Sequence, residues 1–132
     1  MPTLTYVRFV VTTQDSDSGR RQGLFQAAAA LAAAHVMHAH EIAEYEELRR
    51  WFNANLETPE RLAVSPRPHS KAQALSWFKS SATEHIAHMR SLARLLESHG
   101  VTTEMIRSSR PGYVLYEDDY QVAAYPFAET TT

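Results

Sequence analysis

Residues 3–13 read TLTYVRFVVTT, and this stretch decides the fold class because β-branched and aromatic residues dominate it. Val7, Phe9 and Val11 fall on one side of an extended chain, and the remaining apolar residues, among them Val10, fall on the other. Only one residue of the stretch is charged. The pattern therefore predicts a strand in the interior of a sheet, or close to it.

The whole chain has 132 residues, enough for one compact domain. Its 44% hydrophobic and 21% charged residues are ordinary globular proportions, which excludes wholesale disorder. A formal net charge of −2 argues against a general nucleic-acid binder, which usually carries a basic surface. The absence of cysteine excludes disulfides, thiolate zinc sites and cysteine nucleophiles.

Two helices are expected between Arg20 and Leu56, where proline is absent and Gly23 is the only glycine. A single helix of that length would reach about 55 Å, too long for a domain of this size. The acidic residues that follow His40 are typical of the first turns of a new helix. We therefore expect a sharp break near Met37 to His40.

A third helix is predicted from Ser70 to Ser98, with Gly100 as its stop signal. Apolar residues spaced by three and four would form its buried stripe: Leu75, Phe78, Ala82, Ile86, Met89, Ala93 and Leu96. We expect Phe78, Ile86 and Met89, at the centre of the stripe, to be buried.

The last third of the chain changes to a strand-like period, and Arg110-Pro111-Gly112 is a strong turn signal. Residues 128–132 are expected to be a frayed tail. The predicted strands are Val101 to Arg107, Tyr113 to Tyr116 and Tyr120 to Phe127.

These elements predict a single α+β domain over residues 1–132, in the order β-α-α-α-β-β-β. The sheet would be mostly antiparallel, with about four strands and with the helices packed on one face. The opposite face would still expose Tyr6, Val10, Val114 and Tyr116. Such a face favours a homo-oligomer or a protein partner.

Seven histidines are the most unusual feature of the composition. Four form two i, i+3 pairs, His35 with His38 and His85 with His88, and this spacing places two imidazoles on one helix face, as a shared metal requires. Two facing pairs would complete a metal site. The alternative is packed or solvated histidines, which we favour because neither pair has the His-Glu-x-x-His or Glu-x-x-His pattern.

Four arginines give a candidate anion-binding patch at one end of the sheet: Arg20, Arg21, Arg107 and Arg110. Ordinary surface cations are the alternative. The sequence contains neither a glycine-rich phosphate loop nor a nucleophile elbow, so we expect no cofactor and no catalytic residue.

Residues 23–37, GLFQAAAALAAAHVM, follow two arginines and superficially resemble a signal peptide. The run comes after a predicted strand, and it is too short and too rich in alanine to span a bilayer. We therefore expect a cytoplasmic protein without a membrane segment.

Together these observations favour a small soluble binding or regulatory protein that acts through a protein partner or its own dimer, without catalysis. The alternative hypothesis is a histidine-dependent metalloprotein, or a small metal-dependent hydrolase, that uses His35, His38, His85 and His88.

Overall fold

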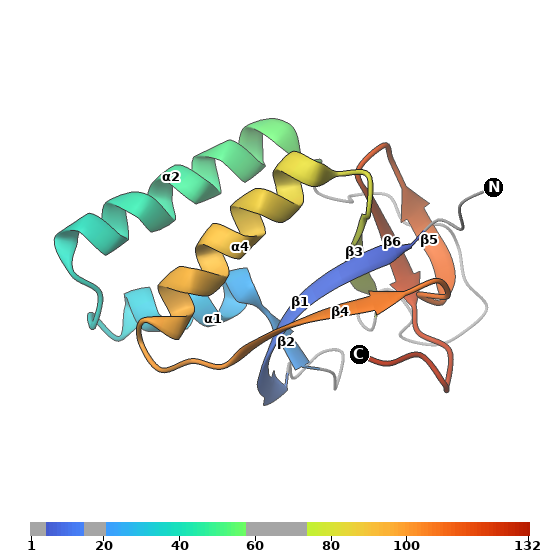
Figure 1. The fold of residues 1–132 in the computed structure, drawn as a ribbon, viewed down its shortest axis with the longest axis horizontal. Helices are drawn as coiled ribbons and strands as arrows, with labels where there is room; N and C mark the ends of the chain where they lie inside the picture. Colours follow the sequence, from blue (N-terminus) through green and yellow to red (C-terminus); the bar gives the residue numbers. More distant parts are fainter. Residues whose placement is uncertain (1–4, 15–20, 58–73) are drawn as a thin grey trace.

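The computed structural model describes residues 5–14, 21–57 and 74–132. Within these ranges the chain is an α+β fold, with three helices on one side of a strongly twisted six-stranded sheet (Figure 1). The elements in chain order are β1 (Tyr6–Gln14), β2 (Arg21–Gly23), α1 (Leu24–Ala33), α2 (Ala39–Asn55), β3 (Leu75–Lys79), α4 (Thr83–Glu97), β4 (Thr103–Ser108), β5 (Tyr113–Glu117) and β6 (Gln121–Tyr125).

Strand β1 is the centre of the sheet, and its predicted alternation is confirmed. Val7, Phe9 and Val11 are buried in the main core, together with residues of the three helices. Val10 points the other way and belongs to a second, smaller core. The strand therefore has a packed layer on each side, as its run of apolar residues requires.

The two edges of β1 carry different neighbours, and every pairing in the sheet is antiparallel. Strand β4 pairs with β1 continuously from Tyr6 to Val11. Strand β3 pairs with β1 at Tyr6 and Val7, whereas β2 pairs with it at Val10 and Gln14. Because β4 occupies one edge along this whole length, β2 and β3 must share the other edge. They meet β1 on either side of Arg8 and Phe9.

The predicted start of the third helix is wrong. Leu75–Lys79 is a strand that pairs with β1 and β6, and helix α4 begins only at Thr83. Leu75 and Trp77 lie two residues apart on one face and are 5% and 1% exposed, which is the period of a strand. Ser70 lies outside the described residues. Of the three side chains expected at the centre of the stripe, Met89 is buried, and Phe78 and Ile86 are partly buried against the core.

The expected break between the first two helices is confirmed. Helix α1 ends at Ala33, and α2 begins at Ala39. The chain reverses through His35, which adopts a left-handed conformation with φ 58°. Strand β2 was not expected, because three residues with two polar side chains carry no strand pattern.

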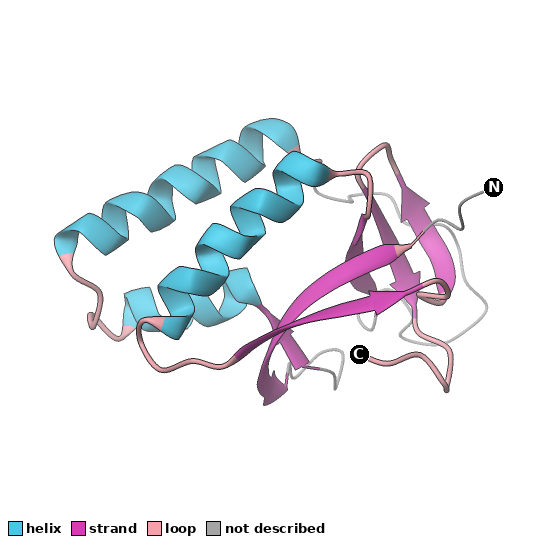
Figure 2. Cartoon of the chain, in the orientation of Figure 1, coloured by secondary structure: helices cyan, strands magenta, loops and turns pink. Residues whose placement is uncertain are grey.

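The second face of the sheet is largely covered within the chain, which corrects the expectation of an exposed apolar face. Figure 2 shows β1 and β4 crossing the direction of β5 and β6 steeply, so the sheet folds over on itself. Val10 is 0% exposed, whereas Val114 remains 44% exposed. The second core brings together residues of four strands: Val10, Leu75, Trp77, Ile106 and Val122.

The C-terminal residues pack against the β4–β5 turn, in contrast to the frayed tail expected for residues 128–132. The Thr130 hydroxyl donates to the Arg110 carbonyl oxygen at 3.1 Å and accepts from the Phe127 N–H at 3.1 Å. Thr130 is buried. None of the described helices combines the length and apolar composition that a membrane span requires.

Candidate binding pocket

The structure does not bring the two histidine pairs together. His35 and His38 lie in the connection before α2 and are exposed, and the N–H of His38 donates to Glu41 Oε1 at 2.9 Å. His85 lies at the other end of α2, where its Nε2 donates to the Asn55 carbonyl oxygen at 2.8 Å. The 17 residues of α2 separate the pairs by about 25 Å. No group of three or more metal-ligating side chains occurs among the described residues.

The histidines of α4 have structural partners. His88 stacks on the ring of Trp51, with ring centres 3.8 Å apart, and His85 stacks on Tyr120 at 4.5 Å. His85 is 4% exposed. These ring contacts pack α2, α4 and the β5–β6 turn against one another.

The predicted arginine patch does not form as one surface in the described part of the chain. Arg21 pairs with Glu104 at 2.6 Å, whereas Arg110 pairs with Glu129 at 3.4 Å beyond the far end of β4. Arg107 is exposed on β4, opposite Val7. Arg20 lies outside the described residues. The three described arginines of the predicted patch are therefore dispersed, and two of them are paired with glutamates.

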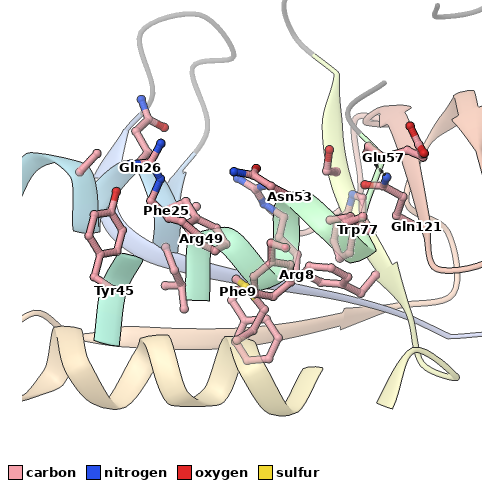
Figure 3. A pocket seen from close by; sticks show the side chains of 18 residues that line it. Arg8, Phe9, Phe25, Gln26, Tyr45, Arg49, Asn53, Glu57, Trp77 and Gln121 are labelled. Carbon is pink, nitrogen blue, oxygen red and sulfur yellow. Dashed lines mark hydrogen bonds between the residues drawn. The ribbon is translucent and has the colours of Figure 1, made fainter. Parts of the chain in front are cut away.

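A pocket of about 680 Å³ lies where α1 and α2 cover the junction of β1, β2 and β3 (Figure 3). Eleven of its lining residues are apolar, aromatic or glycine: Phe9, Gly23, Leu24, Phe25, Ala29, Tyr45, Phe52, Leu56, Trp77, Phe78 and Met89. Seven are polar or charged: Arg8, Gln26, Arg49, Asn53, Glu57, Ser76 and Gln121. This volume and this mixed lining are typical of sites for small organic molecules.

The sheet topology explains why the pocket exists. Strands β2 and β3 leave Arg8 and Phe9 between them on one edge of β1, and both residues line the pocket. Phe9 contributes its ring from the helix side, where it is packed in the main core. Arg8 belongs to the opposite side of the strand, and its guanidinium donates to the Arg21 carbonyl oxygen on β2. The gap between β2 and β3 therefore gives the pocket both an apolar wall, from Phe9 of the main core, and a cationic side chain, from Arg8.

Helix α2 supplies the polar rim. Arg49 is exposed, and its guanidinium lies over the Tyr45 ring, 5.7 Å from the ring centre. In Figure 3, Gln26 and Tyr45 lie at one end of the pocket, and Trp77 and Gln121 lie at the other.

A hydrogen-bond network fixes the Gln121 end. The Gln121 amide donates to the Glu57 carbonyl oxygen at 2.6 Å and to Asp118 Oδ2 at 3.1 Å. Burial acts to raise the pKa of the Asp118 carboxyl, but hydrogen bonds from Tyr120, Gln121 and Tyr116 outweigh it, so this pKa lies below its usual 3.8. Asp118 is therefore ionised at neutral pH and holds the β5–β6 turn in place. Asp118 therefore stabilises the β5–β6 turn.

Trp77 carries a pocket-lining side-chain group that is buried and has no hydrogen-bond partner among the described residues. Its side chain is 1% exposed, and its Nε1–H meets no acceptor in the described part of the chain. A buried donor without an acceptor costs about 1–3 kcal/mol. A ligand atom that accepts this hydrogen bond would recover that cost.

The sequence interpretation missed the pocket. Arg8 is the single charged residue of the stretch 3–13, and Trp77 falls within the residues predicted as the third helix. A charged residue in the middle of an interior strand was the available signal, because such a residue needs polar company. Comparison of the chain with protein-family models, with curated proteins and with solved structures gives no match.

Proposed function

We propose that this chain is a non-enzymatic binding protein that takes an amphipathic small molecule into the pocket between α1, α2 and β1–β3. The observation that carries the proposal is the lining: a cavity of about 680 Å³ with an aromatic wall and a small set of polar groups around it. The described site residues include no nucleophile–base pair and no metal cluster, and a binding role requires neither.

The test uses N-phenylnaphthylamine, a neutral dye whose fluorescence rises in apolar sites. Ala29 is an exposed residue of α1 that lines the pocket, so Ala29→Phe would fill part of the cavity without disturbing the core. Ala30 is its exposed neighbour and does not line the pocket, so Ala30→Phe is the matched control.

We expect the dye to bind the wild-type chain and the Ala30→Phe variant equally, and the Ala29→Phe variant at least about tenfold more weakly. A tenfold change corresponds to about 1.4 kcal/mol, which is the cost of losing a modest apolar contact area. Absence of binding to the wild-type chain, or equal binding by the two variants, would overturn the proposal.

A second candidate function is self-association through β5, and a separate observation favours it. Among the described strands β5 pairs with β6 alone, and it exposes Tyr113 and Val114 by 48% and 44%. An apolar edge strand can pair with a second copy of itself.

Light scattering over a range of concentrations tests this candidate. We expect a dimer that Val114→Lys weakens, because a charged side chain on an edge strand opposes pairing. Val36, which is 50% exposed in the α1–α2 connection, provides the control Val36→Lys. A wild-type chain that remains monomeric at high micromolar concentration removes this candidate.

A further inference from the structure

We infer that the pocket selects an apolar anion: a molecule with an aromatic or aliphatic body and one carboxylate or similar oxyanion, held by Arg8 and Trp77. This inference deepens the proposed function and rests on it. It concerns which chemical class of ligand the pocket prefers.

The sheet register places the two key residues on one face of the sheet. Tyr6 pairs with Lys79 and Val7 with Phe78, so Arg8 and Trp77, the next residue along each strand, share a face just beyond the point where β3 stops pairing with β1. Both residues line the pocket. A guanidinium-bearing and an indole-bearing residue thus line the same pocket.

The charge of the lining favours an anion. Arg8 and Arg49 are the cationic residues among the lining residues, and Glu57 is the acidic one, so the formal charge of the lining is positive. Arg8 is only 8% exposed. A charge in such a poorly solvated position interacts more strongly with a ligand charge than it would in water. The Arg8 guanidinium donates to the Arg21 carbonyl oxygen, and the several N–H donors of a guanidinium match the geometry of an oxyanion.

Trp77 supplies an independent argument for an acceptor at the same place. Its Nε1–H, within the part of the chain that is described, has no acceptor, and the side chain is 99% removed from solvent. An indole N–H can only donate. A ligand that places an oxyanion there satisfies Trp77 and Arg8 together, whereas a neutral hydrocarbon satisfies neither.

The experiment compares two dyes that differ by one group. Anilinonaphthalene sulfonate carries an anionic sulfonate, and N-phenylnaphthylamine has the same aromatic body without it. Dissociation constants of both dyes are measured for the wild-type chain and for Arg8→Met, which removes the charge and keeps an apolar stem, and for Trp77→Phe, which removes the donor and keeps an aromatic ring.

We expect Arg8→Met to weaken binding of the sulfonate dye by about tenfold or more, and Trp77→Phe to weaken it several-fold. Binding of the neutral dye should change less than twofold. Raising the salt concentration should weaken the sulfonate dye selectively.

If Arg8→Met fails to fold, substitution of Arg49 tests the same inference. Arg49→Gln removes an exposed pocket cation, and Arg50→Gln removes the neighbouring exposed cation of α2 that does not line the pocket. Only Arg49→Gln should weaken the sulfonate dye. If the neutral dye binds in the pocket and none of these substitutions changes the preference between the dyes, the inference is overturned and the proposed function stands. If neither dye binds, the proposed function is overturned as well.

Discussion

At Gly112 the backbone passes so close to the end of β6 that a side chain has no space. A Cβ atom there would lie 2.0 Å from the Tyr125 carbonyl oxygen, and the residue has φ 138°. Gly100, which lies shortly after the end of α4, also has a positive φ of 77°, but a Cβ atom there meets nothing within 4 Å. Adding a side chain at Gly100 would therefore cost only the strain of a left-handed backbone. At Gly112 the same strain would be combined with a steric clash.

Gly112→Ala is expected to destabilise the fold by more than about 3 kcal/mol, because both strain and overpacking act on it. Gly100→Ala should cost only about 1–2 kcal/mol, the cost of the left-handed conformation for a residue with a side chain. Urea unfolding of the two variants measures the difference. Equal losses would show that the close approach to Tyr125 does not exist in solution.

Glu41 is a buried carboxylate at the start of α2, and it joins that helix to the end of α4. The N–H of His38 donates to Glu41 Oε1 at 2.9 Å, and His99 Nε2 donates to Glu41 Oε2 at 2.8 Å. The bond from His38, followed by that from His99, outweighs the effect of burial and holds the pKa of Glu41 below its usual 4.5.

This lowered pKa predicts an acid-labile contribution to stability. The unfolded chain takes up the proton at a higher pH than the folded chain, so the contribution is fully present above about pH 4.5 and is lost as the pH falls through the folded pKa. Glu41→Gln should therefore reduce the difference in unfolding free energy between neutral and acidic solution. A variant whose stability has the same pH dependence as the wild-type chain would contradict the proposed role of Glu41.

At the scale of elements, α2 lies between the two histidine pairs that the sequence pattern placed in one candidate metal site. One histidine pair precedes its first turn, and the other packs against its last turn, where His85 donates to Asn55. The structure therefore assigns His85 a packing and hydrogen-bonding role between two helices.

Zinc provides the corresponding prediction. Added to protein without a histidine tag, it should leave the melting temperature unchanged, because an ion stabilises a fold only when it binds the assembled site. His85→Asn should lower the melting temperature by removing the ring that stacks on Tyr120. A rise with zinc that disappears in both His38→Ala and His85→Asn would show that the pairs do converge.

The element order also shows where sequence patterns are decisive. The alternation of β1 and the break before α2 were predictable, because each follows from the spacing of residues close in the chain. Residues 75–79 were not, since Leu75 and Phe78 fit a helical spacing and Leu75 and Trp77 fit a strand. Pairing with β1 and β6 selects the strand, and those partners lie far away in the sequence.

At the scale of the whole molecule, the twist of the sheet produces two cores and the pocket described above. The sequence predicted the main core through Val7, Phe9 and Met89, but it could not predict that Val10 and Trp77 would share a second core within the same chain. The candidate site was unpredictable for the same reason. Arg8 and Trp77 reach the same pocket only through the pairing of β1 with β3, and no local pattern encodes that pairing.

Binding of a ligand at Trp77 can be followed through the two indole N–H signals in a ¹H–¹⁵N correlation spectrum. The chain has two tryptophans, Trp77 in the pocket and Trp51 in the histidine stack, and Trp51→Phe assigns the signals. Titration with anilinonaphthalene sulfonate should shift the Trp77 signal as its N–H gains an acceptor, and leave the Trp51 signal in place. A Trp77 signal that stays fixed at saturating dye, or a shift confined to Trp51, would contradict ligand binding at Trp77.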